Sequence, residues 1–309
     1  MAKDKVAQRR RREERLAPSR SGRGSGGGGG RFSPVAIAIG CVVGVLVVVV
    51  AFVILYELRG QGKGGNGKRS AVPASVLHAI TTIPTSEFNQ IGAQAVTAFP
   101  YTVKSPKPVK AGGKPLLLYL GAEYCPYCAA ERWGMVAALS RFGSFSNLGA
   151  THSSSVDVYK NTATFSFYGS TYTSPYITFQ AVETYTNKVQ GNFYAPLQTP
   201  TRAQAHLNAV FDAPPYVPSA VAGSIPFIFF GGYYVQAGAS YVPQVLQGLS
   251  MTQIGAELHT PIDAPTQAIV STANVISAGI CKMTGGQPAT VCSTAGVKTA
   301  AAKIAAAAG

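Results

Sequence analysis

The chain has 309 residues, of which 47% are hydrophobic and only 12% charged, and its formal net charge is +14. Soluble domains carry about 25% charged residues, so this composition excludes an ordinary soluble protein and a disordered one, and indicates a protein that lies partly in a membrane. The charge is mostly N-terminal: residues 1–31 hold ten basic and three acidic side chains, whereas residues 71–309 hold twelve and eight. A folded region this close to neutral gives no case for a nucleic-acid partner.

An uncharged apolar segment, residues 35–56, is 22 residues long. As a helix rising about 1.5 Å per residue it would be about 33 Å long, which matches a hydrocarbon core of about 30 Å. The apolar part of a cleaved signal peptide is shorter, so we predict an uncleaved signal-anchor, with a buried core helix as the alternative. Because arginines cluster before this segment, the N-terminus is predicted to be cytoplasmic and the rest of the chain extracytoplasmic. Cys41, inside the segment, is assigned no chemistry.

Composition divides the chain into five regions. Gly-rich tracts on both sides of the apolar segment hold too little apolar surface to fold and serve as tethers. The region after them is long enough for one large fold, or for a smaller fold with an insertion. The predicted regions are a basic, Gly-rich cytoplasmic tail at 1–34, a transmembrane helix at 35–56, a flexible linker at 57–72, an extracytoplasmic domain at 73–295 and an Ala-rich tail at 296–309, either helical or frayed.

The first strand signal of the outer domain is the apolar run from Leu116 to Gly121. A continuous apolar run of this length is typical of a strand buried on both faces, at the centre of a sheet. Residues 122–141 follow with mostly helix-forming side chains, and Pro126 suits a first helical turn. A Cys-x-x-Cys motif, Cys125 and Cys128, is therefore predicted where a buried strand turns into a helix.

Further elements are expected downstream. Residues 153–185 alternate apolar and polar side chains and predict two or three strands, with a turn at 170–175. The remaining elements are predicted in this order: a helix at 201–211, an apolar strand at 224–232 opened by Pro226, one or two helices at 242–259, and a helix at 264–282 capped by Asp263.

Two cysteines at this spacing and at a helix start allow thiol-disulfide exchange. Unpaired N–H groups and the helix dipole stabilise the thiolate of Cys125, so its pKa is predicted to lie below that of an ordinary thiol, unlike that of Cys128. Cys128, one turn on, can then attack a mixed disulfide. Half of a zinc site is the alternative, but it needs two further ligands, and the histidines at 78, 152, 206 and 259 are scattered. We therefore assign no metal and no cofactor.

The run Gly121-Ala122-Glu123-Tyr124-Cys125-Pro126-Tyr127-Cys128, followed about a hundred residues later by Ile225-Pro226, resembles the thioredoxin superfamily. With the residues up to Trp133 and a terminal pair, Cys281 and Cys292, it is similar to a prokaryotic family of membrane-anchored thioredoxin-like proteins with a Cys-Pro-Tyr-Cys motif. The resemblance covers residues 75–292 and implies an α/β fold, a mixed sheet flanked by helices. It implies Cys125 as the nucleophile, Cys128 as the resolving cysteine, and Pro226 as a cis-proline that faces them. Ile225 would offer backbone hydrogen bonds to a peptide substrate.

Two features depart from the thioredoxin pattern. Thioredoxins carry a buried Asp six residues before the first cysteine, where this chain has Tyr119, and the difference puts efficient disulfide reduction in doubt. Glu123 and Glu131 lie near the motif, but solvated surface carboxylates are the simpler interpretation. The stretch 141–218 is longer than a minimal thioredoxin fold needs, and is either an insertion between the Cys-x-x-Cys helix and the cis-proline that shapes a substrate groove, or an elaborated sheet.

Cys281 and Cys292 are predicted to form a structural disulfide. Disulfides persist outside the cytoplasm, and closing a short loop stabilises a domain by about 2–3 kcal/mol. A second redox pair, which relays electrons to or from the Cys-x-x-Cys, is the alternative.

Three aromatic residues, at positions 124, 127 and 133, lie near the motif in the sequence. Tyr124 and Tyr127 flank the thiols; they either limit access and contact substrate, or are ordinary exposed tyrosines. Trp133 is predicted to lie in the core.

Two functions of different classes are compatible with these features. The first is a membrane-tethered, extracytoplasmic thiol-disulfide oxidoreductase that acts on cysteines of exported proteins, together with an unidentified membrane or envelope redox partner. The second is a non-catalytic thioredoxin-like binding or scaffold module of the cell envelope, in which Cys125 and Cys128 form a structural disulfide. The presence of both cysteines with Pro126 between them favours the enzyme.

Overall fold

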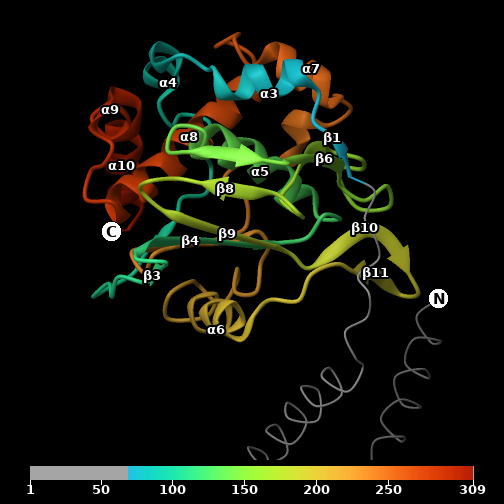
Figure 1. Cartoon of the computed structure of the whole chain (residues 1–309), viewed down its shortest axis with the longest axis horizontal. Coiled ribbons are helices and arrows are strands. Elements are labelled where there is room, and N and C mark those ends of the chain that lie inside the picture. Colours follow the sequence, from blue (N-terminus) through green and yellow to red (C-terminus); the bar gives the residue numbers. More distant parts are fainter. Residues whose placement is uncertain (1–68, 309) are drawn as a thin grey trace, which may run out of the picture. The chain divides into compact units, whose positions relative to one another are not determined.

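A computed structural model describes residues 69–308 of the chain, which form a mixed sheet flanked by helices (Figure 1). The centre of the sheet is β4, Lys114–Gly121, between β9, Thr178–Glu183, which is parallel to it, and β12, Phe227–Phe230, which is antiparallel. The apolar run is thus a central strand, as predicted. The sheet is completed by β13 (Tyr234–Ala237) and β2 (Tyr101–Thr102) beyond β12, and by β3 (Lys110–Ala111) at the start of β4.

The helices surround this sheet. α5, Pro126–Leu139, has Pro126 in its first turn and packs along α8, Ala264–Met283. Gly134 permits this close packing, because an added Cβ would clash with Thr272 of α8. The other helices of the described residues are α3 (Ala74–Thr81), α4 (Thr85–Ile91), α6 (Arg202–Phe211), the 3-10 helix η2 (Pro243–Leu246), α7 (Met251–Glu257), α9 (Ala289–Cys292) and α10 (Ala295–Ala307).

Two apolar cores lie on the two faces of the sheet, separated by β4. Leu117 and Tyr119 belong to the core that contains α5 and α8. Leu116, Leu118 and Leu120 belong to the core on the other face, together with Phe211 of α6. Figure 1 shows α6 on one side of β4 and β9, and α5 with α8 on the other. Successive side chains of a strand point to opposite faces, so a strand covered on both faces is apolar throughout.

Smaller sheets accompany the central one. Their strands are β1 (Ser70–Ala71), β6 (Gly149–His152) and β7 (Ala163–Ser166) in one sheet, β5 (Ser144–Ser146) and β8 (Thr171–Thr173) in a second, and β10 (Tyr185–Gln190) and β11 (Phe193–Pro196) in a third. The predicted turn at 170–175 is wrong, because it contains β8. Gly169, with a φ of +67°, makes the chain turn earlier, before β8 begins.

The ends of the domain also differ from the sequence-based boundaries. Ser70 and Ala71, assigned to the linker, form β1 and pair with β6. The Ala-rich tail is helical rather than frayed: α10 packs on α4 and α8 and buries Ile304. Asp263 is at the N-cap position of α8, as predicted, but its side chain makes no hydrogen bond to the first turn of the helix.

Within residues 69–308, no helix is both long enough and apolar enough to cross a membrane. The predicted transmembrane helix at 35–56, with Cys41, and the predicted tail at 1–34 lie outside the described residues.

Candidate functional site

The Cys-x-x-Cys motif lies where β4 ends and α5 begins, as predicted. Cys125 is the N-cap of α5, and its sulfur accepts a hydrogen bond from the backbone N–H of Cys128 at 3.3 Å. The Cys125 thiol also lies 3.8 Å from the carbonyl oxygen of Ile225, to which it donates. The Ile225–Pro226 peptide bond is cis, as the resemblance implies, and β12 begins at the next residue. The fold therefore brings Cys125 next to Ile225, which lies a hundred positions further along the chain.

The two thiols are free and differ in their pKa values. Cys125 is 5% exposed, and Cys128 is fully buried. The pKa of Cys125 lies below that of an ordinary thiol, because the Cys128 thiol and backbone N–H groups of the helix end donate to its sulfur, and Arg132 adds a positive charge. The pKa of Cys128 is raised well above the ordinary value, because burial and the neighbouring Cys125 disfavour its thiolate. Since the thiolate is the nucleophile, this difference favours attack by Cys125.

An ion pair buried beside the motif was not predicted from the sequence. Arg132, one turn after Cys128 on α5, contacts Glu183, the last residue of β9, with 2.6 Å between Nη1 and Oε1, and both side chains are fully buried. Burial raises the pKa of Glu183 to about 7, although Arg132 opposes this rise. The positive charge of Arg132 favours the thiolates of Cys125 and Cys128, whereas Glu183 disfavours that of Cys128. The charge state of this pair therefore acts on both thiols.

Tyr119 is fully buried and lies against the motif. Its hydroxyl accepts a hydrogen bond from Arg132 Nη1 at 3.4 Å. Gly121 makes room for this hydroxyl, because an added Cβ there would clash with it and would lie 3.0 Å from the sulfur of Cys128. Burial raises the pKa of Tyr119 well above its ordinary value, so the phenol stays neutral. A buried carboxylate whose charge acts on Cys128 is that of Glu183, on the neighbouring strand.

The interpretation of Glu123 and Glu131 as solvated surface carboxylates is wrong. Glu123 is 2% exposed, and Glu131 is fully buried on α5. Burial raises the pKa of Glu131 to about 7, although its hydrogen bonds oppose this rise. Buried carboxylates need such partners. Glu123 accepts hydrogen bonds from the hydroxyls of Ser166 and Thr151, and Glu131 from the backbone N–H of Ser240 at 2.7 Å and the side chains of Ser240 and Gln236.

Tyr124 and Tyr127 connect the motif to segments that lie between α5 and β12 in the chain. The ring of Tyr124 is stacked on Tyr194 of β11, with 4.1 Å between the centroids. Tyr127 is 38% exposed, and its ring lies 6.1 Å from that of Tyr159. Neither is an isolated surface tyrosine. Trp133 is fully buried and donates to the carbonyl oxygen of Ala163, so its predicted place in the core is confirmed.

Cys281 and Cys292 form a disulfide, as predicted, with 5.6 Å between their Cα atoms. The bond joins α8 to the short α9, across a loop in which the N–H of Gly286 donates to the carbonyl oxygen of Cys281. It therefore closes the turn between the long buried helix and the C-terminal helices.

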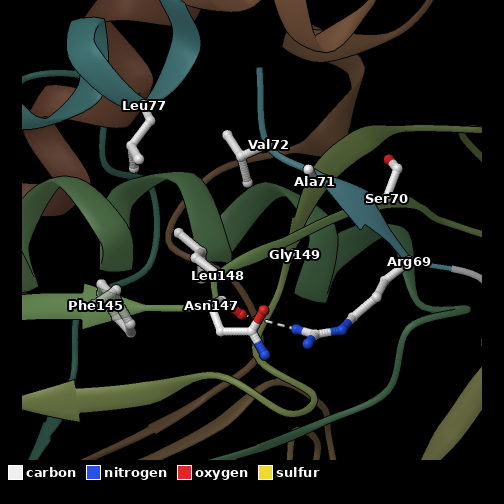
Figure 2. Close-up of a pocket in the computed structure, with 9 residues that line it drawn as sticks. All are labelled: Arg69, Ser70, Ala71, Val72, Leu77, Phe145, Asn147, Leu148 and Gly149. Carbon is white, nitrogen blue, oxygen red and sulfur yellow. Dashed lines mark hydrogen bonds between the residues drawn. The ribbon is translucent and has the colours of Figure 1, made fainter. Parts of the chain in front are cut away.

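A pocket of about 420 Å³ lies between β1 and the connection from β5 to β6 (Figure 2). Arg69 crosses it and donates from Nη1 to the carbonyl oxygen of Asn147 at 2.8 Å. The rest of the lining is small or apolar, and none of the predicted site residues belongs to it, so the pocket takes no part in the thiol site. No group of three or more His, Cys, Asp or Glu side chains among residues 69–308 is placed to hold a metal ion.

A protein family described as a domain of unknown function, DUF929, matches residues 100–282, which is more than half of the chain. The matched segment runs from the residue before β2 almost to the end of α8. It contains Cys125, Cys128, Ile225 and Pro226, and ends before Cys292. No curated protein and no solved structure matches the chain.

Proposed function

The chain belongs to the DUF929 family, whose description names no activity, and we propose from the chemistry of its site that it is a thiol-disulfide oxidoreductase. One observation carries the proposal: the thiol of Cys125, with its lowered pKa, caps α5 and faces the Ile225 carbonyl, while the thiol of Cys128, with its raised pKa, lies buried behind it. Exchange needs one thiol that attacks as a thiolate and a second that stays protonated until it is required.

The reaction has two steps. The thiolate of Cys125 first attacks one sulfur of a substrate disulfide, so that a Cys125–substrate bond forms and the other substrate sulfur leaves as a thiolate. Cys128 then loses its proton and attacks the sulfur of Cys125, which forms the Cys125–Cys128 disulfide and releases the second substrate sulfur. The substrate gains the two electrons that the two cysteines lose. The reverse steps oxidise a substrate dithiol, and a redox partner of the dithiol or disulfide class restores the pair.

The buried ion pair supports the second step. The positive charge of Arg132 favours the thiolate that Cys128 must form. A pKa of about 7 lets Glu183 take up a proton near neutral pH, which is what a general base requires. We propose that Glu183 supplies, from β9, the buried acid whose position in thioredoxins is occupied here by Tyr119.

The fold supports a place in the thioredoxin superfamily. The resemblance implies a mixed sheet flanked by helices, with the Cys-x-x-Cys at a strand–helix junction and a proline before a second buried strand. β4, α5 and β12 have this arrangement. On this proposal the segment between α5 and β12, which forms β5 to β11 and α6, contains an insertion.

We propose further that the domain lies outside the cytoplasm, tethered by a transmembrane helix at 35–56. The basic N-terminal tail supports this orientation. The disulfide between Cys281 and Cys292 supports it independently, because such bonds persist in oxidising compartments. The substrates would then be exported proteins with cysteines, and the redox partner a protein of the membrane or envelope.

The experiment that tests the function traps the mixed disulfide. With a peptide disulfide as substrate, the Cys128→Ser variant of the full chain should accumulate a covalent complex through Cys125, because the second step is blocked. The Cys125→Ser variant is the matched control and should accumulate none, since its remaining thiol is buried. Mass spectrometry of the intact protein, with and without dithiothreitol, measures both. If neither variant forms the complex, the chain is a binding or scaffold module instead.

A further inference from the structure

Exposed large apolar side chains are concentrated around the thiol site. Of the large apolar side chains exposed within residues 69–308, Leu77, Val242 and Ile262 lie on separate segments of the chain. The others belong to the motif and to two segments between α5 and β12, and we call them the apolar rim. The apolar rim consists of Tyr127, Val156, Val158, Val189 and Phe193, which are 38%, 65%, 56%, 57% and 49% exposed.

The first arm of the apolar rim is the loop 154–160, which carries its two valines at 156 and 158. The base of the loop is tied to the motif, because the backbone N–H of Ser154 donates to the carbonyl oxygen of Tyr124 at 2.8 Å. Its far end packs on the motif as well, since the rings of Tyr159 and Tyr127 lie 6.1 Å apart. The loop that carries the two valines is therefore anchored to the motif at both ends.

The second arm is the hairpin of β10 and β11, which extends beyond the central sheet in Figure 1. Its base is tied to the same segment, where the N–H of Glu123 donates to the carbonyl oxygen of Tyr185 at 2.9 Å. The ring of Phe193 lies 5.5 Å from that of Tyr124, and Val189 stands on the partner strand. Within the described residues β11 pairs with β10 alone, so its outer edge is open.

We propose that the apolar rim binds an extended, non-native polypeptide segment with apolar side chains on both sides of its cysteine. The inference rests on the proposed function and names the substrate class. Contiguous exposed apolar side chains mark interaction sites. Folded proteins bury most such side chains, whereas unfolded chains offer them, so an apolar rim selects unfolded chains. Both arms contact the segment that carries Cys125, which is only 5% exposed, so a partner that reaches its sulfur is more readily an extended chain than a folded surface. Such a chain can also pair with the open strand edge of β11.

A lipid surface is the alternative partner of the apolar rim, because the domain is proposed to be tethered to a membrane. Membrane-surface segments are rich in Lys and Arg and place Trp at the interface. Here the loop 154–160 carries Asp157 as well as Lys160, and the hairpin carries Lys188 alone. The one Trp of the chain, Trp133, is fully buried. These features favour the polypeptide.

The test measures binding without thiol chemistry. The full chain, with Cys125→Ser and Cys128→Ser, is placed in lipid nanodiscs, and a fluorescent, cysteine-free peptide rich in Val and Phe is titrated against it, with empty nanodiscs as the blank. The matched probe is the same peptide with every Val and Phe replaced by Ser, and it should bind at least about tenfold more weakly. Val156→Ser/Val158→Ser and Val189→Thr/Phe193→Ser should each weaken binding of the apolar peptide about tenfold, which is the effect of losing about 60 Å² of buried apolar surface. Val242→Ser/Ile262→Ser, outside the apolar rim, should bind like the parent.

Equal binding of the two peptides, or unchanged binding by the rim variants, would overturn the inference. So would rim variants that lose association with phosphatidylcholine–phosphatidylglycerol vesicles but keep the peptide, because the apolar rim would then serve the membrane. Exchange of the wild-type cysteines with glutathione disulfide, which is too small to need the rim, tests the proposed function separately. If the protein exchanges with glutathione disulfide but does not bind the apolar peptide, the inference about the apolar rim is wrong and the proposed function stands. If it binds the apolar peptide but does not exchange, the proposed oxidoreductase function is wrong and the apolar rim stands as a peptide-binding surface.

Discussion

Two pairs of cysteines in one domain differ in almost every physical respect. Cys125 and Cys128 are free, lie at the N-terminus of α5, and have buried ionisable side chains as neighbours. Cys281 and Cys292, 11 positions apart in the chain, are joined by a disulfide at the C-terminal end of α8. Cys281 belongs to the apolar core and Cys292 packs against it. The same side chain is thus placed in one polar and one apolar setting.

The difference indicates that the groups around a pair of cysteines determine whether the pair can exchange disulfides or only cross-links the chain. A helix N-terminus offers N–H groups that stabilise a thiolate, whereas a helix C-terminus offers only carbonyl oxygens, which do not. Changes around the first pair should therefore alter exchange and its pH dependence. Changes around the second pair should alter stability alone.

The replacement of Cys125 by Ser tests the first half of this separation. Cys125→Ser should lower the rate of exchange with a peptide disulfide about a thousandfold or more, because the nucleophile is lost. Cys281→Ser/Cys292→Ser should leave that rate within about twofold at a temperature where the variant is folded. Stopped-flow measurement of peptide reduction checks both. A large loss of exchange in the second variant would mean that Cys281 and Cys292 relay electrons.

Glu183→Gln tests the electrostatic control of the first pair. The neutral side chain leaves Arg132 as an uncompensated buried charge, which should cost about 3–5 kcal/mol of stability. Because Glu183 disfavours the thiolate of Cys128 and Arg132 favours it, the variant should lower the pKa of Cys128. The chemical shift of the Cys128 Cβ against pH, followed by NMR in a Cys125→Ser background, measures that pKa without a reagent having to reach the buried thiol.

Two further variants separate this effect from loss of structure. Glu131→Gln removes another buried carboxylate of α5 that is not among the charges acting on either thiol, so it should leave both thiol pKa values unchanged. Arg132→Met/Glu183→Leu removes both charges and should recover much of the stability, because an apolar pair avoids the desolvation penalty. A pKa of Cys128 that rises in Glu183→Gln would contradict the account.

A large part of the pH dependence of stability should come from Glu131, a buried carboxylate of the helix that carries the first pair. The pKa of Glu131 is about 7 in the folded chain against an ordinary value of 4.5, so between these pH values the folded state holds a proton that the unfolded state has lost. Stability therefore falls as pH rises through this window. Glu131→Gln should remove roughly 3 kcal/mol of that fall, since one pKa unit corresponds to about 1.4 kcal/mol. Urea unfolding of parent and variant at pH 4.5 and pH 8 measures it, and parallel curves would contradict it.

Loss of the second pair should have the smallest effect of these changes. Cys281→Ser/Cys292→Ser should lower the free energy of unfolding by about 2–3 kcal/mol, because the unfolded chain gains the entropy of an open loop of about a dozen residues. The loss should be the same at pH 5 and pH 8, since no shifted carboxylate is involved. A loss that changes with pH would mean that the two regions are coupled.

The strand–helix unit that carries Cys125 and Cys128 could be predicted because its signals are local: an apolar run, a proline in the first turn and two cysteines one turn apart. The pairing of Cys281 with Cys292 was similarly accessible, because few partners exist in the chain. The turn before β8 was misplaced, since Ser and Pro at the ends of 170–175 favour a turn, whereas the Thr and Tyr side chains between them favour a strand. Gly169, with its positive φ, is where the chain turns.

The buried ionisable groups could not be predicted in the same way. The partners of Glu123, Glu131 and Arg132 lie 13 to 109 positions away in the chain, and the fold alone brings them together. One signal was available. Glu131 and Arg132 are the only charged residues in α5, among small and apolar side chains that leave no polar face to carry them. Charged residues in such a helix are buried and need partners.

A redox titration of the full chain tests the separation of the two pairs most directly. The protein is equilibrated in glutathione buffers of graded potential, quenched with an alkylating mass tag, and digested so that each pair is counted separately. The account predicts that Cys125 and Cys128 interconvert reversibly between dithiol and disulfide at potentials between about −270 and −120 mV, where Cys281–Cys292 stays oxidised, because structural disulfides have potentials below about −300 mV. A Cys125–Cys128 pair that keeps one state over this whole range, or two pairs that titrate together, would contradict it.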